Sequence, residues 1–188
     1  MTGGRPRRRR LFFALWPDEA TRAALGAAAA GAAAAAGGRA VAAANLHLTL
    51  EFLGQVPDAQ LDSLRAVGAA LALPDESLLL DRLDWWRRAA MLVAAPSAPG
   101  QALLAAQADL RQVLKARGFR VDSRAFRPHV TLARKLTAPP PPAAAPIAVA
   151  WPVRELALVE SVPTPTGSRY TPLARWRGGV VAADIGAL

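Results

Sequence analysis

The chain of 188 residues is long enough for one domain, or at most two, and excludes a large multidomain assembly. Its composition, 53% hydrophobic and 20% charged, is typical of a globular protein, and the absence of cysteine excludes disulfides, thiolate metal sites and a cysteine nucleophile. The net charge of +9 favours an anionic partner such as RNA or a phosphorylated ligand without identifying one.

A basic segment precedes the first predicted element. Five of the positive charges are Arg5 and Arg7 to Arg10, and without them 18 basic and 14 acidic residues leave a charge of only +4. We expect residues 1–10 to form a disordered tail ahead of a single domain over residues 11–188; the alternative is an auxiliary phosphate-binding arm. No apolar run suits a signal peptide or a membrane span, and a chain without cysteine fits a reducing compartment. We therefore expect a cytoplasmic protein that does not bind membranes.

The first half of the chain predicts two strand and helix pairs. The apolar run at 11–16 predicts a buried strand. Pro17 and the two acidic residues after it predict the start of a helix that continues through an alanine-rich tract to about residue 36, where Gly37 ends it. Residues 45–53 predict the next strand, and 59–71 the next helix.

The second half predicts more strands. Residues 77–86 and 90–95 predict an antiparallel pair, which an amphipathic helix over 99–117 follows. Further strands are predicted at 127–136, 149–162 and 169–177, with a stiff proline-rich linker at 139–146. Because helices and strands mix without a strict βαβ rhythm, the pattern favours an α+β fold.

Both histidines of the chain open the same short pattern. The two copies are His47-Leu48-Thr49-Leu50 and His129-Val130-Thr131-Leu132. With eight threonines in the chain, a threonine two residues after each histidine has a chance probability of about 0.2%. The copies lie 82 residues apart, close to half the chain, which predicts two similar lobes that each contribute one copy.

Strand geometry predicts that the two residue types act together. Alternate side chains of a strand point to opposite faces, so each histidine shares a face with its threonine while the apolar residues between them face the core. Two imidazoles across a shared cleft form an acid and base pair, because a pKa near 6.5 suits both tasks at neutral pH. A metal site is the weaker alternative, since two histidines are too few ligands, although Glu51 shares the face of His47 under strict alternation.

With their flanking residues, these motifs make the chain similar to the 2H phosphoesterase superfamily and, within it, to the RNA 2′,3′-cyclic phosphodiesterases once called 2′-5′ RNA ligases. The flanking matches are residues 11–15 and 45–46, Phe52-Leu53-Gly54, Arg127-Pro128, Arg134 and residues 168–173. The resemblance implies a bilobal, pseudo-twofold α+β fold, with antiparallel sheets flanking a central cleft and helices outside.

The resemblance also implies an activity. The expected enzyme is a monomeric hydrolase without a metal or other cofactor that opens a terminal 2′,3′-cyclic phosphate of RNA to a 2′-phosphate. Transfer RNA halves are possible substrates, and a weak reversible 2′-5′ RNA ligase activity is implied as well. His47 would donate a proton to the departing 3′ oxygen and His129 would activate water, although the near-symmetry of the motifs leaves either order open. Thr49 and Thr131 would bind the nonbridging oxygens.

Four further residues are expected to bind substrate. Arg134 matches a phosphate-contacting arginine, but it lies five residues after His129 and needs the strand to end or bulge before it. Phe52 is a candidate for stacking on a base, although strict alternation points it inward like Leu48. Arg169 and Tyr170 are expected to support the wall of the cleft. The remaining aromatic candidates for base stacking, most of which we expect in the core, are Trp85, Trp86, Trp151 and Trp176.

Two alternative functions stay open at this point. The same site could act on a small cyclic nucleotide, a 2′-5′ oligoadenylate or an ADP-ribose cyclic phosphate. The basic tail and the aromatic residues also suit an RNA-binding module without catalytic activity. Such a module would bind RNA in a salt-dependent way, indifferent to the terminal phosphate and to loss of both histidines.

Overall fold

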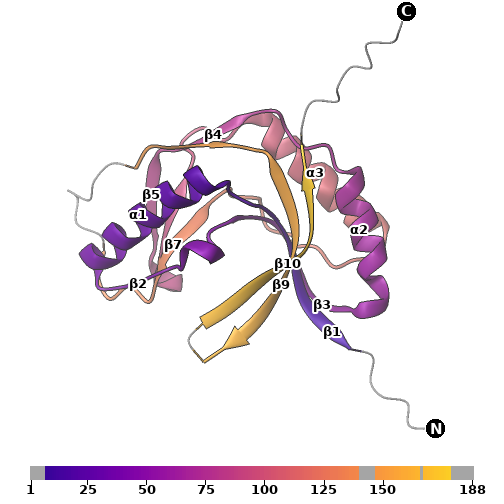
Figure 1. The fold of residues 1–188 in the computed structure, drawn as a ribbon, viewed down its shortest axis with the longest axis horizontal. Coiled ribbons are helices and arrows are strands. Elements are labelled where there is room, and N and C mark those ends of the chain that lie inside the picture. Colours follow the sequence, from indigo (N-terminus) through magenta and orange to yellow (C-terminus); the bar gives the residue numbers. More distant parts are fainter. Residues whose placement is uncertain (1–6, 140–146, 166, 179–188) are drawn as a thin grey trace, which may run out of the picture.

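The computed structural model describes residues 7–139, 147–165 and 167–178 (Figure 1). Its helices are α1 (Glu19–Ala36), α2 (Leu61–Ala70) and α3 (Gln101–Ala116), with short 3-10 turns at Ala43–Asn45, Asp58–Gln60 and Arg87–Ala89. Its strands are β1 (Arg8–Leu15), β2 (Arg39–Ala40), β3 (Leu48–Pro57), β4 (Ser77–Leu80), β5 (Arg82–Trp86), β6 (Met91–Ala95), β7 (Val130–Arg134), β8 (Val149–Pro152), β9 (Glu155–Thr164) and β10 (Gly167–Arg177). The mixture of elements confirms the α+β prediction.

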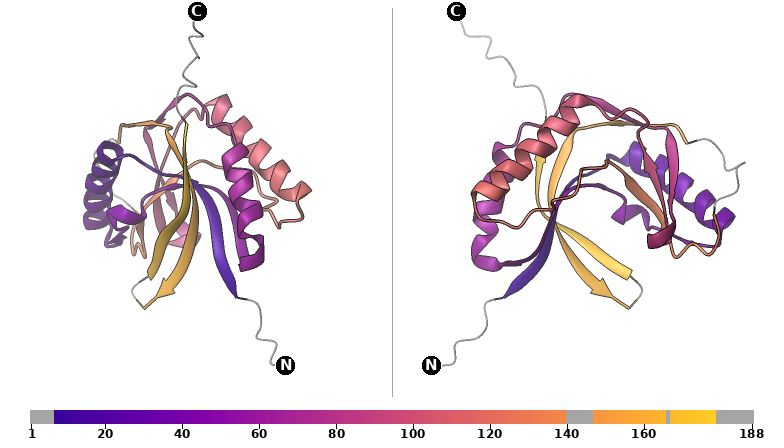
Figure 2. Two further views of the ribbon diagram at one scale, coloured as in Figure 1. Left: turned by 45° about the vertical axis from the view of Figure 1, so that its right-hand side comes forward. Right: turned by 180° about the vertical axis from the view of Figure 1, so that it is seen from behind.

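One antiparallel sheet runs through the described part of the chain. Its strand order is β10-β9-β1-β3-β7-β6-β5, and β2 pairs with β7; a second small sheet consists of β4 and β8. The two halves of the large sheet meet where β3 pairs with β7, and this pairing is limited to Leu48 and Val130. Figure 2 shows the sheet curving strongly at this junction, so that the two lobes share a sheet and face one another.

The two lobes exchange their helices. In the chain, α1 follows β1 and α3 follows β6, and these two strands are the neighbours of β3 and β7 in the sheet. However, α1 packs against β7, the strand of the second motif, and α3 packs against β3, the strand of the first (Figures 1 and 2). The predicted duplication is therefore present as two similar strand-helix-strand units that cover one another.

Helix α1 has the ends that its sequence predicts. The Asp18 carboxylate accepts a hydrogen bond of 2.8 Å from the Thr21 N–H at the N-terminus. Gly37 ends the helix in the left-handed conformation, with φ of 62°. The small alanine side chains let the helix approach β7 closely, since Ala33 and Ala36 lie in one buried cluster with Ala133.

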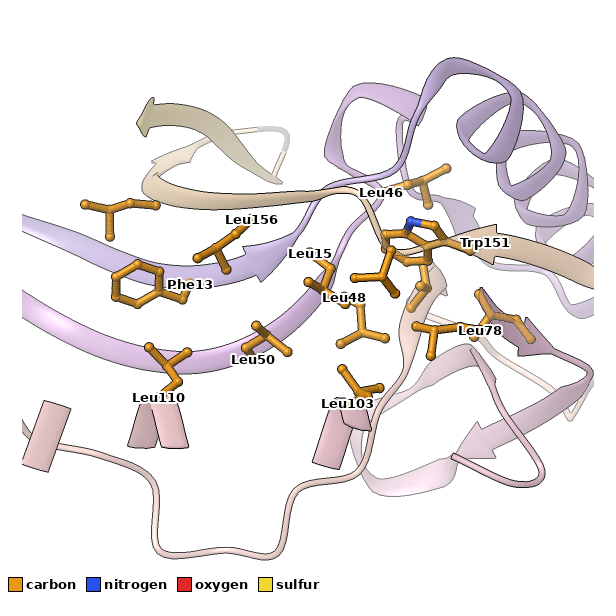
Figure 3. Packing of buried hydrophobic residues seen from close by; sticks show 14 of the residues in the cluster. Phe13, Leu15, Leu46, Leu48, Leu50, Leu78, Leu103, Leu110, Trp151 and Leu156 are labelled. Atoms are coloured by element: carbon orange, nitrogen blue, oxygen red, sulfur yellow. The ribbon is translucent and has the colours of Figure 1, made fainter. Parts of the chain in front are cut away.

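The main core extends through both lobes and includes the face of β3 that packs against α3. Leu48 and Leu50 of β3 point toward Leu103 and Leu110 of α3 (Figure 3). Trp151 of β8 is fully buried next to this cluster, so this tryptophan is a core residue. One face of the strand that carries the first motif is therefore fixed by hydrophobic packing, which holds its other face in place.

Three of the predicted strands have wrong boundaries. Strand β1 begins at Arg8 rather than at residue 11, so Arg8 to Arg10 belong to the sheet instead of a tail, because they pair with residues of β3. The strand predicted at 149–162 is two strands in different sheets, since β8 pairs with β4 while β9 pairs with β1 and β10. The strand predicted at 77–86 is likewise two strands in different sheets, since β4 pairs with β8 while β5 pairs with β6. Asp81 lies between them and accepts hydrogen bonds from the N–H and hydroxyl of Ser97. Residues 1–6 of the tail and 140–146 of the proline-rich linker lie outside the described residues.

Candidate active site

The two motifs lie side by side at the junction of the lobes. His47 and His129 immediately precede β3 and β7, and the antiparallel pair of Leu48 with Val130 stands between the two copies. Around such a pair, flanking residues of the two strands oppose each other, which places His47 beside Thr131 and Thr49 beside His129. The predicted convergence of the two copies is therefore present in the fold.

Backbone carbonyl groups orient both imidazoles in the same way. Nδ1 of His47 lies 2.6 Å from the carbonyl oxygen of Asn45, and Nδ1 of His129 lies 2.7 Å from that of Arg127. A carbonyl oxygen only accepts, so each Nδ1 carries a proton and donates it. In both copies the carbonyl belongs to the residue two positions before the histidine. Nε2 is consequently the nitrogen without a proton in each neutral ring, and Nε2 of His47 lies 3.1 Å from the Thr49 hydroxyl.

Aromatic rings surround the His47 imidazole. It stacks on Trp16 with 5.8 Å between ring centroids, and it contacts Phe12 and the edge of Tyr170, each at 5.0 Å. Burial among these rings lowers the pKa of His47 to about 4, against the opposing effect of the Asn45 carbonyl. The positive charges of Arg134 and His129 lower this pKa further. His47 is thus neutral at pH 7 in the ligand-free protein.

The environment of His129 is similar in kind. Its ring lies 4.4 Å from that of Trp86, centroid to centroid, and the Arg127 guanidinium lies 5.4 Å from the Trp86 ring centroid. Burial lowers the pKa of His129, the Arg127 carbonyl opposes this, and the charges of Arg127 and Arg134 add to the lowering. Arg134 therefore acts electrostatically on both imidazoles, and it lines the pocket that contains His47.

Matching β-bulges follow the two motifs. In the pairing of β3 with β1, two consecutive residues of β1 pair with Glu51 and Thr49, so Leu50 has no partner on β1. In the pairing of β7 with β6, two consecutive residues of β6 pair with Ala133 and Thr131, so Leu132 has no partner on β6. Each bulge reverses the alternation of the strand after the fourth residue of the motif.

The bulges bring Phe52 and Arg134 to the face of the histidines, since both residues lie five positions after a histidine. The bulge that Arg134 required is confirmed, and its Nη1 lies 2.9 Å from the Met91 sulfur. For Phe52 the alternation argument is wrong: its side chain is 47% exposed rather than inward-pointing, and its ring contacts Phe12 at 5.4 Å.

The side chain of Glu51 lies on the opposite face of β3 from His47 for the same reason. Its side chain is fully buried and accepts hydrogen bonds from Arg111 Nε at 2.9 Å, Gln107 Nε2 at 3.2 Å and the Asp122 N–H at 2.7 Å. It ties β3 to α3 and to the segment that leads to His129. The idea that Glu51 joins His47 as a metal ligand is therefore wrong, because the bulge moves it to the opposite face. In the part of the chain that the structure describes, no three His, Asp or Glu side chains gather as a metal site.

The side chains of Tyr170 and Arg169 lie on opposite faces of β10. Tyr170 contacts both His47 and Phe12, and the Asn45 side chain donates to the Ser168 carbonyl at 2.9 Å, which fixes β10 against the first motif. Arg169 lies between Ser168 and Tyr170, so its side chain points to the opposite face, where it is exposed. The structure thus brings Tyr170 to the site and leaves Arg169 outside it.

Phe52 borders two of the pockets that adjoin the motifs. The His129 pocket, of about 390 Å³, contains Thr49 and His129 together with Trp86, Phe126 and Arg127. The His47 pocket, of about 480 Å³, contains His47, Thr131, Arg134 and Tyr170.

Sequence reasoning missed several residues around the motifs. Phe12 of β1 and Trp16, which follows that strand, both contact His47, and their alternating positions are a signal that could have found them. Arg10 continues the same alternation and lines the His47 pocket, as does Arg39 of β2. Among the candidate tryptophans, Trp86 reaches the site, whereas Trp176 packs against Phe13 in the core.

No helix in the described ranges is long and apolar enough for a membrane crossing.

Comparisons with known proteins agree with this geometry. The chain is 33% identical over 171 residues to the RNA 2′,3′-cyclic phosphodiesterase of Escherichia coli, covering 89% of this chain and 95% of that protein. It is 31% identical over 178 residues to the protein of that name from Thermus thermophilus, covering 89% of each chain. The crystal structure of E. coli LigT complexed with 3′-AMP superposes with a TM-score of 0.77 at 32% identity, covering 91% of this chain and 98% of that one. Residues 16–163 match the family model of the 2′-5′ RNA ligase superfamily. The chain therefore belongs to the 2′-5′ RNA ligase superfamily, the 2H phosphoesterases that the duplicated motif predicted.

Proposed function

We propose that this protein hydrolyses the 2′,3′-cyclic phosphate at an RNA end to a 2′-phosphate by acid and base catalysis with two histidines. One observation carries the proposal: two imidazoles, both with the proton fixed on Nδ1, lie at the paired ends of β3 and β7, and the charge of Arg134 acts on both. The names of the E. coli and T. thermophilus relatives support the substrate.

The reaction follows from the position of the two Nε2 atoms. Nε2 of His129 takes a proton from water as the water oxygen attacks phosphorus. The bond between phosphorus and the 3′ oxygen breaks, and Nε2 of His47, protonated in the substrate complex, gives its proton to that oxygen. The products are a 3′-hydroxyl and a 2′-phosphate. His47 is neutral in the ligand-free protein. The negative charge of the bound substrate raises the pKa of His47, so that the ring is protonated in the complex.

The neighbouring polar groups suit the phosphoryl oxygens. The hydroxyls of Thr49 and Thr131 donate to the two nonbridging oxygens, one from each strand. Arg134 balances the negative charge that builds on the phosphoryl group in the transition state. Phe52 and Tyr170 provide aromatic surface for the terminal nucleoside. Because Arg134 and the two hydroxyls stabilise the phosphoryl oxygens, the proposed mechanism uses no metal ion.

A second activity is supported by the His129 pocket. In the same step with the 5′-hydroxyl of another RNA in the place of water, Nε2 of His129 takes the proton of that hydroxyl as its oxygen attacks phosphorus, the 3′ oxygen departs with the proton of His47, and a 2′-5′ linkage forms. The reverse step, with His129 protonated, breaks this linkage and restores the cyclic phosphate. The pocket beside His129 presents Trp86 and Phe126, aromatic surfaces on which a nucleoside can stack. We therefore include weak 2′-5′ RNA ligation in the proposal.

The proposed setting is a cytoplasmic monomer acting on RNA, transfer RNA halves among the substrates. Both histidines, both threonines and Arg134 come from one chain, which supports a complete site in a single subunit. The chain contains no cysteine, which is compatible with a reducing compartment.

Alanine substitution of each histidine tests the proposed function. His47→Ala and His129→Ala should each lower kcat/KM on an oligonucleotide with a 2′,3′-cyclic end about 100-fold to 10,000-fold, with EDTA present throughout. Arg88→Ala, a change at an exposed residue that is not part of the lining of either pocket, should keep wild-type activity. Full activity of His129→Ala would overturn the proposal.

A substrate panel separates the other functions. Small cyclic nucleotides and 2′-5′ oligoadenylate should be turned over less efficiently than the oligonucleotide. RNA binding without turnover, unaffected by loss of both histidines, would instead identify a binding module.

A further inference from the structure

The His47 pocket carries more positive charge than one cyclic phosphate requires. Arg10, Arg39 and Arg134 line it from three different strands, together with the titratable His47. No carboxylate of the described residues is part of its lining. A 2′,3′-cyclic phosphodiester carries a single negative charge, which Arg134 alone balances. The composition of this pocket therefore points to a ligand with a second anionic group.

Arg39 and Arg134 lie opposite each other on paired strands. They are direct partners in the antiparallel register of β2 and β7, so their side chains leave the same face of the sheet at neighbouring positions. Like charges in such a pair destabilise a sheet. Negative charge bound beside each of the two guanidinium groups offsets this repulsion.

Arg10 extends the site along β1. It shares a strand face with Phe12, whose ring contacts His47 at 5.0 Å, and it lies two residues, or about 7 Å, further along the strand. The preceding Arg9 faces the other way, where it forms ion pairs with Asp58 at 2.9 Å and Glu160 at 3.0 Å. Of these two neighbouring arginines, one is thus committed to the fold and the other faces the pocket.

We propose that Arg10 and Arg39 bind the phosphate on the 5′ side of the terminal nucleotide. This inference rests on the proposed function. In that reaction the 3′ oxygen departs toward His47, so the terminal ribose lies on the His47 side of the scissile phosphate and its 5′ substituent extends into the His47 pocket. Arg134 binds the cyclic phosphate, and the guanidinium groups of Arg10 and Arg39 form charge-assisted hydrogen bonds with the next phosphate. The protein therefore selects an RNA end over an isolated nucleoside cyclic phosphate.

Turnover of three matched substrates tests this subsite. They are a nucleoside 2′,3′-cyclic phosphate with a 5′-hydroxyl, the same nucleotide with a 5′-phosphate, and a dinucleotide with a 2′,3′-cyclic end. For the wild type, kcat/KM should be about tenfold to a hundredfold higher with either 5′ phosphate group than with the 5′-hydroxyl. In Arg10→Ala and Arg39→Ala this ratio should fall several-fold, and in the double variant it should approach one.

Arg8→Ala is the matched control, since Arg8 lies on the same strand and lines neither pocket. It removes the same charge and should keep the wild-type ratio. A wild-type ratio near one, or an unchanged ratio in the double variant, would overturn the subsite. Preference for the dinucleotide without any effect of a 5′-monophosphate would also contradict it, because it would assign the selectivity to the additional nucleoside.

Equilibrium binding separates a failure of the subsite from a failure of the proposed function. A nucleoside 2′,5′-bisphosphate should bind more tightly than the nucleoside 2′-phosphate, and the double variant should lose this difference while Arg8→Ala retains it. This result stands even if no cyclic phosphate is hydrolysed. Equal binding of the two nucleotides by the wild type would refute the subsite whatever the catalytic activity.

Discussion

At the scale of single residues, the site depends on how two imidazoles are held. Each donates from Nδ1 to a carbonyl two residues earlier, and each is packed against aromatic rings. The carbonyl fixes the tautomer and stabilises the imidazolium, whereas burial and Arg134 favour the neutral ring. In the ligand-free protein, burial lowers the pKa of His47 by more than the Asn45 carbonyl raises it. The negative charge of a bound phosphate raises this pKa again. This makes protonation of His47 a consequence of substrate binding.

The lowered pKa of His47 predicts a pH-dependent stability. As pH falls below about 6.5, the unfolded chain takes up a proton at His47, while the folded chain stays neutral there until about pH 4. The free energy of unfolding should therefore fall over this window, by about 1–2 kcal/mol at pH 5 relative to pH 7 from this residue. Urea unfolding of the wild type and His47→Gln at both pH values measures the effect, because glutamine cannot take up the proton. Equal losses of stability in the two proteins would show that the pKa of His47 is not lowered.

At the scale of elements, the β-bulges decide which side chains reach the site. Both bulged residues are leucines, and the backbone carbonyl of each accepts a hydrogen bond from a group outside the bulged strand pair. The Leu50 carbonyl accepts from Gln107 Nε2 at 3.3 Å, and the Leu132 carbonyl accepts from the Val41 N–H at 2.8 Å. A bulged residue lacks the hydrogen-bond partner that the neighbouring strand would provide, so these two donors stabilise the bulges. In the first lobe, the residue after the bulge, Glu51, adds a buried network that holds α3 and the approach to His129.

Glu51 should therefore be important for stability. Glu51→Ala leaves the partly buried Arg111 and the Asp122 N–H without their acceptor and should lower the free energy of unfolding by about 3–5 kcal/mol. Glu51→Gln keeps an acceptor oxygen and should cost less. Asp62→Ala, which removes a carboxylate 92% exposed on α2, should change stability by about 0.5 kcal/mol or less. Urea denaturation of the three variants checks the order, and a Glu51→Ala variant as stable as Asp62→Ala would contradict the role assigned to the network.

The difference between Arg134 and Phe52 shows what the sequence could and could not predict. For Arg134, the matching motif and the wrong parity together required a bulge, and the structure contains it. For Phe52, strict alternation gave the wrong face, because the shift at Leu50 arises from pairing with β1, a strand about 40 residues earlier that local patterns do not report. Helix α1 was predictable with its ends because alanine propensity, the Asp18 cap and Gly37 are all local signals.

At the scale of the whole molecule, the duplication explains the position of the site. Two similar strand-helix-strand units meet at the pair of Leu48 and Val130, which sets one histidine on each side of the junction. Each helix packs on the strand of the other motif, so neither lobe forms its core independently. The half-chain spacing of the motifs predicted two lobes, but the exchange of helices depends on packing between distant segments and carries no local signal. The site is therefore a product of the interface between the lobes.

A crystal structure of the full chain with inorganic phosphate bound tests the central claim most directly. The account predicts one phosphate at the junction of the lobes, with Nε2 of His47 and Nε2 of His129 both within hydrogen-bond distance of its oxygens and Arg134 beside it. A phosphate that contacts one imidazole while the other remains out of reach would contradict the account.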